Sequence, residues 1–377
     1  MKIIVAPNAM KGSLSAIEAA NAMELGILSA IPDANIVKLP IADGGDGLTS
    51  TLADSLNTAW KSCLVKNAIG ATIEASYLYC EEKELAIIEM ASAAGLAQLD
   101  ESQYDPINAN TIGVGELILS ALDLGVKKIV LGIGGSATTD GGTGLASALG
   151  FRFLDKNHHV LTPGGKRLAD IYTIDTSSID QRLSNIEFNV ACDVTNPLTG
   201  ETGAAKIYGP QKGATKEQIV FLDHGLKHFS QVLESTFKLK IDHIAGAGAA
   251  GGLGAGMMAM LNAKLSSGAD LVLDLLEFEK HTSTTDLIIT SEGKLDTQTQ
   301  FGKAPFVLAK RASKLNIPCA VIAGQIESSN QEINKMGFSA AISLTSPTIT
   351  MEQAIANASS LLTDRTKNLI ITLTLLP

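Results

Sequence analysis

Residues 127–144 read KKIVLGIGGSATTDGGTG and join a short apolar run to a loop rich in glycine and hydroxyl groups. The run from Lys128 to Ile133 is typical of a buried strand, and a helix is expected to begin near Thr143. The preceding helix is expected to end at Gly125 in the left-handed conformation. This succession predicts an α/β protein. Glycine-rich turns are common in such folds, so an ordinary capped turn explains the stretch equally well.

The loop between this strand and helix has the composition of an anion-binding site. Gly134 and Gly135 would let main-chain N–H groups approach a ligand, while Ser136 and Thr138 would add hydroxyl donors. The start of the following helix would favour phosphate. Asp140 does not suit a bare anion, because a carboxylate beside a phosphate makes sense mainly when a divalent cation joins them. The loop therefore predicts a metal–nucleotide complex, with Asp140 as a candidate metal ligand.

Length and composition indicate a globular protein with a large interior. The chain has 377 residues, of which 45% are hydrophobic and 18% are charged, and its formal net charge is −10. This length allows two domains. A pI near 5.1 and the lack of a basic run argue against a nucleic-acid surface. Small anionic ligands stay possible, because local lysines can serve a site that the net charge does not describe.

Cysteine spacing and hydropathy predict a cytoplasmic protein without membrane spans. Cys63, Cys80, Cys192 and Cys319 show no C-x-x-C spacing and are best explained as reduced thiols. The first residues, MKIIVAPNAMKGS, lack the apolar core of a signal peptide. No run reaches the roughly 18 apolar residues that a spanning helix needs.

The order of predicted elements suggests an inserted domain. Short apolar strands alternate with helices at both chain ends, which is typical of a parallel sheet. Residues 60–91 instead read as a β-meander. We therefore predict a Rossmann-like parallel-sheet domain from residues 1–60 plus 284–377. A mixed α/β domain, residues 61–283, would be inserted into it, with the active site in the cleft between the two.

Two loops near the N-terminus carry groups that suit an anionic substrate. Lys11 and Ser13 follow the first strand, at the edge where open α/β sheets bind ligands. A lone lysine there is more often simply solvated, and Ser13 or Ser15 could instead cap the next helix. After the second strand, Asp43 and Asp46 flank residues 44–45, Gly44 and Gly45, in a tight turn. An ordinary Asx turn is the equal alternative.

Further along the chain, an acid again follows a strand. The strand IEFNVACDV ends at Asp193 and is followed by a long loop that contains Gln211 and Lys212. Lys206 or Lys212 could neutralise phosphate oxygens. An ordinary surface loop is the alternative, but a loop of this length inside a compact domain is usually functional.

Residues 246–251, GAGAAG, match the dinucleotide-binding pattern G-x-G-x-x-G, and Asp270 lies where such a fold would place its ribose-binding acid. The preceding segment is a weak strand, however. The glycines that follow are typical of a helix start that packs closely on a neighbour. Close packing is therefore the preferred interpretation.

The loop EGKLDTQTQFGKAP follows the strand DLIITS and contains Glu292, Lys294, Asp296 and Lys303. Five loops thus combine glycine with acids and with lysines or hydroxyls, as phosphoryl transfer to a small hydroxy acid requires. Neither the G-x-x-x-x-G-K-[ST] loop nor the protein-kinase motifs occur. A dinucleotide-dependent oxidoreductase and a non-enzymatic ligand sensor are the rival hypotheses.

The motifs resemble, in order and over nearly the whole chain, those of the bacterial glycerate kinases that phosphorylate D-glycerate with ATP. The matching blocks are APNAMKGSLSA, PIADGGDG, GIGGSATTDGGTG, CDVTNPLTGETGAA, YGPQKGA, GAGAAGGLGAG and EGKLDTQTQFGKAP. The resemblance implies a two-domain α/β kinase that depends on Mg²⁺ and usually yields 2-phosphoglycerate. Met10, Asp46 and Lys294 depart from the common residues, which are an aromatic, a glutamate and an arginine. Lysine at 294 lacks the bidentate grip of arginine.

This resemblance and the loop chemistry give a set of expected roles. The predicted catalytic residues are Asp193, Asp43, Asp296 and Lys11, with Asp193 as the preferred general base. The predicted substrate-binding residues are Lys11, Ser13, Asp43, Gly44, Gly45 and Lys294. ATP phosphates are assigned to Gly134, Gly135, Ser136, Thr138, Gln211 and Lys212, and the metal candidates are Asp140, Asp193 and Glu292. A 3-phosphate product, another hydroxy acid as substrate, and a monomer or a homodimer stay open.

Overall fold

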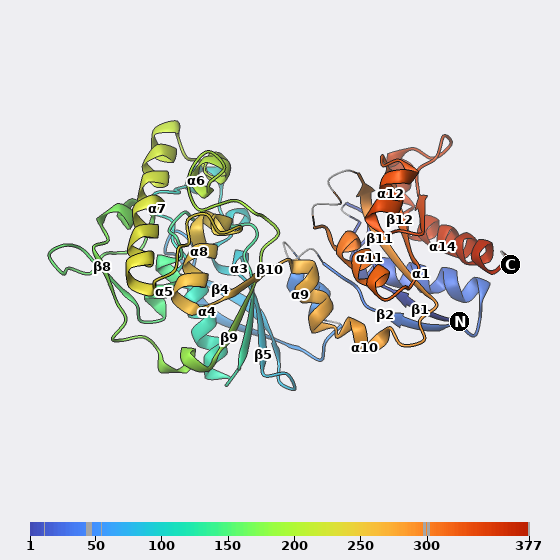
Figure 1. Ribbon diagram of the computed structural model, residues 1–377, viewed down its shortest axis with the longest axis horizontal. Coiled ribbons are helices and arrows are strands. Elements are labelled where there is room, and N and C mark those ends of the chain that lie inside the picture. Colours follow the sequence, from blue (N-terminus) through green and yellow to red (C-terminus); the bar gives the residue numbers. More distant parts are fainter. Residues whose placement is uncertain (11, 43–46, 54, 297–298, 300–301, 376–377) are drawn as a thin grey trace. The chain divides into compact units, whose positions relative to one another are not determined.

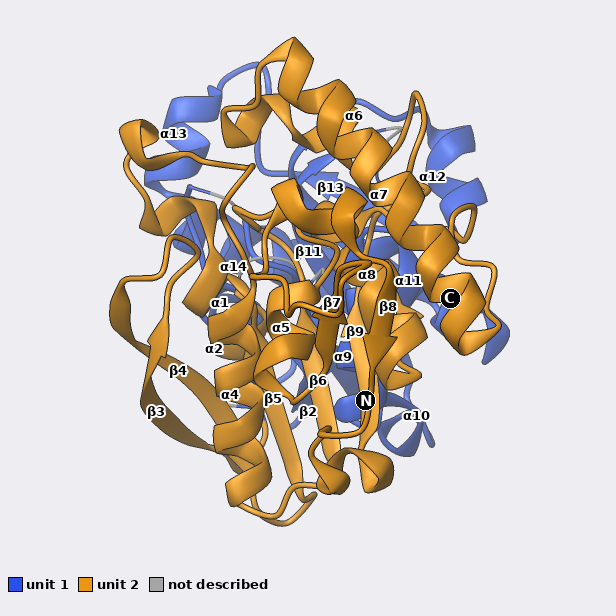
Figure 2. Cartoon of the chain, turned by 90° about the vertical axis from the view of Figure 1, so that its left-hand side faces the viewer, with its two compact units in different colours: residues 1–43, 50–55, 267–377 blue, residues 44–49, 56–266 orange. Residues whose placement is uncertain are grey.

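The computed structural model describes residues 1–10, 12–42, 47–53, 55–296, 299 and 302–375 (Figure 1). The chain divides into two compact units, which Figure 2 colours separately. Unit 1 contains residues 1–43, 50–55 and 267–377, and unit 2 contains residues 44–49 and 56–266. The short helix α2 (Leu48–Ala53) includes residues of both ranges.

Unit 1 joins the two chain ends in one sheet. Its elements are β1 (Lys2–Val5), α1 (Ala16–Ala30), β2 (Asn35–Lys38), α9 (Gly268–Leu275), α10 (Phe278–His281), β11 (Leu287–Leu295), α11 (Ala304–Lys314), β12 (Cys319–Ile326), α12 (Asn330–Met336), β13 (Ala340–Ser343), α13 (Met351–Ala356) and α14 (Ala358–Leu375). Among the described residues the sheet has five parallel strands in the order β13-β12-β11-β1-β2. Ile3 pairs with Leu287, so strands from the two ends of the chain lie next to each other in this sheet.

The core of unit 1 follows from its apolar pattern. Ile3, Val5, Ile289 and Ile322 are fully buried, as expected for strands that are covered on both faces. Helix α1 begins at Ser15, whose side chain accepts the Glu18 N–H in a capping box. Of the two serines expected to cap this helix, Ser15 is therefore the one that does.

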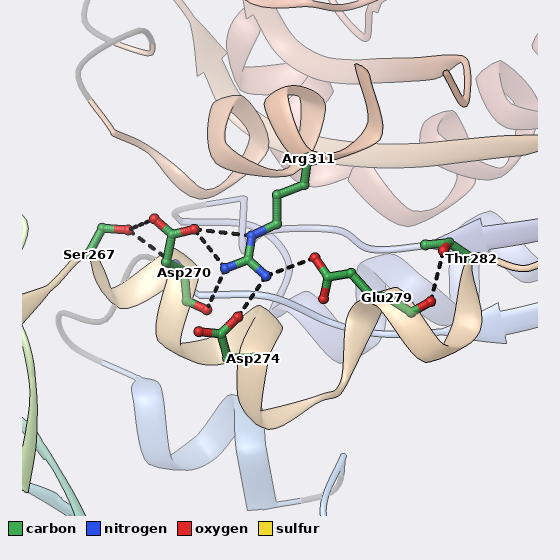
Figure 3. A network of polar contacts seen from close by, with 6 residues as sticks. All are labelled: Ser267, Asp270, Asp274, Glu279, Thr282 and Arg311. Carbon is green, nitrogen blue, oxygen red and sulfur yellow. Dashed lines mark hydrogen bonds and ion pairs between the residues drawn. The ribbon is translucent and has the colours of Figure 1, made fainter. Parts of the chain in front are cut away.

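Helices α9 and α10 belong to unit 1, although the predicted domain boundary placed them in the inserted domain. Arg311 of α11 joins three acids from these two helices, Asp270, Asp274 and Glu279 (Figure 3). The N–Hε and one Nη of Arg311 both donate to Asp270 Oδ1, at 3.1 and 2.8 Å. The predicted and observed boundaries therefore differ over residues 267–283. Contacts between side chains far apart in sequence hold this segment, and a local hydrophobic pattern carries no information about them.

Unit 2 is a mixed sheet covered by helices. Its elements are β3 (Ala59–Lys66), β4 (Thr72–Cys80), β5 (Leu85–Glu89), α3 (Ala91–Ala94), α4 (Ile112–Asp123), β6 (Lys128–Gly132), α5 (Thr143–Ala148), β7 (Arg152–Leu154), β8 (Thr173–Asp175), β9 (Glu187–Ala191), α6 (Ala204–Tyr208), α7 (Lys216–Phe237), α8 (Ala249–Leu261) and β10 (Lys264–Ser266). Short 3₁₀ helices span Leu96–Gln98, Glu101–Gln103, Gly165–Asp170, Gln181–Asn185 and Pro210–Lys212. The order in the described part of the large sheet is β10-β9-β6-β5-β4-β3.

The strands of unit 2 agree with the sequence patterns. The predicted meander is antiparallel where β3 pairs with β4 and β4 with β5, and β3 forms the outer edge of the sheet (Figure 2). From β5 onward the pairings with β6, β9 and β10 are parallel. Gly125 follows α4 with φ of 78°, as predicted. The predicted α/β class is therefore confirmed.

Candidate functional site

Unit 1 has a cavity at the carboxyl ends of its central strands. The strand order reverses between β1 and β11, which is where open α/β sheets bind ligands. The cavity has a volume of about 340 Å³. It is lined by Asn8, Ala9, Met10, Ser13, Glu292, Gly293, Lys294, Lys303, Gly324, Leu344, Met351, Ala354 and Ile355. Three predicted site residues, Ser13, Glu292 and Lys294, thus share one cavity.

Two buried hydroxyl groups hold the loop that follows β1. Thr290 Oγ1 donates to the Ala6 carbonyl at 2.7 Å, and Ser291 Oγ donates to the Asn8 carbonyl at 3.0 Å. Both hydroxyl-bearing side chains are fully buried. They therefore fix the chain just before Lys11. In the sequence, the signal for this role was limited to the two polar residues that end the apolar strand DLIITS.

The charged residues that line the unit 1 cavity all take part in ion pairs. Lys303, at the start of α11, lies 2.9 Å from Glu292 Oε1 and 3.9 Å from Asp296 Oδ1. Lys294 lies 2.9 Å from Glu327, whose hydrogen bond and negative charge raise the pKa of the lysine. An anionic substrate would therefore meet cations that carboxylates already hold in position.

Several predicted substrate residues cannot be placed. Lys11, Asp43, Gly44 and Gly45 lie outside the described residues, as does Asp46. Ser13 is described, and its hydroxyl donates to the Met10 carbonyl at 2.9 Å. This bond leaves the oxygen of Ser13 available as an acceptor.

Unit 2 has a second cavity at the carboxyl ends of β6 and β9. Its volume is about 260 Å³. It is lined by Ile133, Gly134, Gly135, Ser136, Ala191, Cys192, Asp193, Val194, Tyr208, Gln211, Lys212, Ala249 and Ala250. Six residues predicted from separate loops therefore meet here: Gly134, Gly135, Ser136, Asp193, Gln211 and Lys212.

Main-chain hydrogen bonds fasten the glycine loop to its neighbours. The Leu96 N–H donates to the Gly135 carbonyl at 2.8 Å, and the Ala137 N–H donates to the Ala94 carbonyl at 2.9 Å. Gly135 has φ of 70°, which few residues other than glycine adopt readily. The loop is thus held in place before any ligand binds.

Asp140 supports the loop instead of facing the cavity. Its Oδ2 accepts the N–H and hydroxyl of Thr111 at 3.0 and 2.9 Å and the Gly144 N–H at 2.9 Å. Its Oδ1 accepts the Gly142 N–H at 3.1 Å, and the side chain is fully buried. Burial raises the pKa of Asp140, while these hydrogen bonds act in the opposite direction. Because its oxygens are already engaged, Asp140 is not included in the proposal below as a metal ligand.

Thr138 and Lys212 are both buried, the first within the loop and the second beside it. Thr138 is fully buried and is not among the lining residues of the cavity. Lys212 lines the cavity but is only 1% exposed, and its Nζ donates to the Thr138 carbonyl at 2.6 Å. Burial lowers the pKa of Lys212 to about 7, although the charge of Asp140 acts in the opposite direction. The predicted direct contacts with phosphate therefore fit these two residues less well than Gly134, Gly135 and Ser136.

Asp193 presents the exposed carboxylate of the unit 2 cavity. It lies two residues beyond the end of β9, and its side chain is exposed. The neighbouring Cys192 thiol donates to the Val194 carbonyl at 3.3 Å. Burial raises the pKa of Cys192, so this thiol is a poor nucleophile at neutral pH. An acid beside main-chain amides suits proton removal from a hydroxyl group better than covalent catalysis.

The glycines of residues 246–251 pack closely on neighbouring segments, Gly248 on Pro197 and Gly251 on the loop after β6, in agreement with the preferred interpretation. A Cβ atom at Gly251 would lie 2.0 Å from the Thr138 carbonyl oxygen, so a larger residue does not fit. Ala250 has φ of 51° and lines the cavity together with Ala249, which the sequence did not indicate. Asp270, which a dinucleotide-binding fold would have used to bind ribose, pairs with Arg311 in unit 1.

In the described part of the chain, no group of three or more His, Cys, Asp or Glu side chains is placed to hold a metal ion. Magnesium usually needs only one or two carboxylates when substrate phosphates supply other ligands. Asp193 provides an exposed carboxylate of this kind, so the unit 2 cavity suits a metal that arrives with a nucleotide.

The chain is similar to glycerate kinases along nearly its whole length. The glycerate kinase family matches residues 3–374. A glycerate kinase of Halalkalibacterium halodurans is 42% identical over 369 residues, which cover 98% of this chain and 97% of that protein. A glycerate 2-kinase of Escherichia coli is 39% identical over 373 residues, or 99% of this chain and 98% of that one. A solved structure named glycerate kinase 2, from Salmonella typhimurium, matches with a TM-score of 0.90 at 41% identity and covers 99% of this chain and 98% of that chain.

Proposed function

The chain belongs to the glycerate kinase family, and from this premise we propose that it transfers the γ-phosphoryl group of ATP to D-glycerate. The products are 2-phosphoglycerate and ADP. The similarity to the glycerate 2-kinase of Escherichia coli, which covers 99% of this chain, supports the position of the phosphate. The protein is a kinase, and a small hydroxy acid accepts the phosphoryl group.

The observation that carries the proposal is the cavity of unit 2. It gathers the main chain of Gly134 and Gly135, the hydroxyl of Ser136 and the exposed carboxylate of Asp193. Main-chain amides and hydroxyls bind phosphoryl oxygens, and their fixed positions cost little reorganisation during the reaction. We assign the phosphate groups of ATP to this loop and to Gln211.

Asp193 is proposed to act as the general base. Its carboxylate accepts the proton of the attacking hydroxyl group as that oxygen forms its bond to phosphorus. The bond between phosphorus and the bridging oxygen of ATP breaks, and ADP leaves with the electron pair. A positioned base of this kind typically contributes about 10²–10⁴ to the rate.

The residues of the unit 1 cavity are proposed to hold anionic groups of glycerate or of the transferring phosphate. Lys294 and Ser13 stay in this role, because both line the cavity. The pair of Lys303 with Glu292 adds a positioned cation that the sequence assigned to no role. Lys11, Asp43, Gly44 and Gly45 keep their proposed roles from the loop chemistry and the family resemblance, and Asp296 is kept as a candidate acid.

Magnesium enters this scheme as part of the substrate MgATP. When bound, it would neutralise charge on the phosphate oxygens. Asp193 and Glu292 stay the candidate ligands. For Asp193 the roles of base and metal ligand are alternatives, because a carboxylate that holds the metal would leave proton removal to another acid. The cytoplasmic location, the monomeric or homodimeric state and the position of the active site between two domains stay predictions.

The test is phosphoryl transfer from MgATP to D-glycerate, with the product identified by phosphorus NMR. The proposal expects the 2-phosphate. The 3-phosphate would agree with the proposed kinase activity but would contradict the proposed position of phosphorylation. Lactate and tartronate, tested side by side with glycerate, would reveal a different acceptor. No product with any of the three, from folded protein with magnesium, would overturn the reaction itself.

A further inference from the structure

Lys212 was expected to touch phosphate, but its amine points into the protein. The side chain is 1% exposed, and Nζ lies 2.6 Å from the Thr138 carbonyl oxygen, 74 residues away in sequence. The hydrogen bond therefore joins the short helix Pro210–Lys212 to the back of the loop that follows β6.

Main-chain hydrogen bonds anchor the loop at Gly135 and Ala137, whereas its threonine side chains contribute no anchor in the described part of the chain. The hydroxyl groups of Thr138 and Thr139 are buried and have no hydrogen-bond partner among the described residues. Two residues after Thr138, the carboxylate of Asp140 accepts four hydrogen bonds, from Thr111, Gly142 and Gly144. The main chain is thus held at Thr138 by Lys212 and, two residues further on, by the carboxylate of Asp140, which belongs to the loop itself.

We propose that Lys212 is a positioning residue, which aligns the main chain of residues 134–138 for the phosphoryl group through its hydrogen bond to Thr138. It contacts the loop and not the substrate. This inference rests on the proposed function, because it assumes that the loop binds the phosphates of ATP.

The charge of Lys212 also acts on the bound anion. Four titratable groups lie around Lys212 among the described residues. Asp140 lies on the loop, and the cavity lining adds Cys192 and Asp193, which follow β9, and Tyr208, which ends α6. Burial brings the pKa of Lys212 to about 7, so both forms of the amine are populated near neutral pH. A phosphate in the loop would favour the charged form and raise this pKa. Nucleotide binding should therefore be accompanied by proton uptake above pH 7.

The first experiment compares Lys212→Met with Lys216→Met. Methionine keeps the length of the side chain but cannot donate, and Lys216 is an exposed lysine that lies outside the cavity. A hydrogen bond from a charged donor is typically worth about 1.5–3 kcal/mol, so kcat/KM for ATP should fall about 10–100-fold in Lys212→Met. Lys216→Met should behave as the wild type.

The pH profile separates positioning from general damage. In the wild type, kcat/KM for ATP should decline as pH rises through about 7, and Lys212→Met should lack this limb. The ionisation of ATP affects both proteins equally, so it does not contribute to the difference between their pH profiles. A variant that is slow but keeps the limb would overturn the proposal, as would unchanged kinetics.

A measurement on unmodified protein covers the case in which the variant does not fold. Calorimetric titration with a non-hydrolysable MgATP analogue at pH 8, in buffers of different ionisation enthalpy, counts the protons taken up on binding. The nucleotide itself is deprotonated at this pH. Proton uptake by the protein supports the inference, and binding without uptake overturns it. Because no glycerate is present, this result is independent of whether the proposed reaction occurs.

Discussion

At the scale of single residues, the unit 2 cavity separates groups that face the ligand from groups that hold the loop. Asp193 is exposed, whereas Asp140, only eight residues beyond β6, is fully buried among four hydrogen bonds. Both are aspartates beside glycine-rich segments. Their different surroundings suit one to the proposed role of base and the other to holding the loop.

Asp193→Asn should lower kcat by about 10²–10⁴, because the amide cannot accept the hydroxyl proton. KM values should change little if the side chain acts only on the proton. Steady-state kinetics with MgATP and glycerate would measure this. Asp170→Asn is the matched control, since Asp170 is an exposed acid whose surface ion pair with Arg167, at 3.0 Å, contributes little to stability. Near-normal turnover of Asp193→Asn would assign the base to another acid.

Lys212 should also make the stability of the protein depend on pH. Its pKa is lowered to about 7 in the folded state, whereas an unfolded lysine titrates near about 10.4. Between these values the unfolded state binds more protons, so the free energy of unfolding should rise with pH and be reduced below pH 7. Urea titrations of the wild type and of Lys212→Met at several pH values would compare the slopes. Parallel slopes would contradict the shifted pKa.

At the scale of elements, one arginine determines where α9 and α10 belong. Arg311 of α11 contacts Asp270 and Asp274 of α9 and Glu279 of α10 (Figure 3). The acids are half-exposed, but the guanidinium is largely covered and satisfies all three. The chain enters this segment at Ser267, directly after the last strand of unit 2, so the network fastens the beginning of the returning chain to unit 1.

Arg311→Met should destabilise the protein by about 1–2 kcal/mol, because three carboxylates lose their partner but can still be solvated. Amide exchange should become faster in α9 and α10. Arg311→Lys should recover part of the loss, since it restores charge without the bidentate geometry. Urea unfolding and hydrogen exchange would measure both effects. A variant with unchanged stability and unchanged exchange in α9 would show that packing alone holds these helices.

At the scale of the whole molecule, each unit carries its own cavity. Residues from both chain ends build the unit 1 cavity, and the loops after β6 and β9 build that of unit 2. The net charge of −10 is therefore a poor guide to either site, because each has its own arrangement of lysines, amides and acids. None of the described helices is both long and apolar enough to cross a membrane.

The two substrates should protect different parts of the chain from hydrogen exchange. A non-hydrolysable MgATP analogue should slow exchange in residues 134–141, and glycerate should slow it in residues 287–295. NAD should protect neither, because the glycines of residues 246–251 are already packed closely on neighbouring segments. Mass spectrometry of peptides would locate the protection. The reverse pattern of protection would assign ATP to the unit 1 cavity and glycerate to the unit 2 cavity.

Much of the fold and part of the site could be read from local patterns. Six of the predicted residues line one cavity, because residues at the carboxyl ends of neighbouring parallel strands come together. Thr111, Arg311 and the pair of Thr290 and Ser291 were missed. Each acts through a partner that is far away in sequence, and no local signal marks such a partnership.

The amino-acid sequence by itself determined the periodic apolar strands, the glycine loops that follow them, and the motifs of the family. These features depend on neighbouring residues, whose backbone preferences and hydrophobic spacing are local properties. Only the tertiary structure decided that Lys212 and Asp140 are buried and that Asp193 is exposed at the cavity. Burial, hydrogen-bond partners and pKa arise when distant segments pack together, so identical residue types acquired different roles.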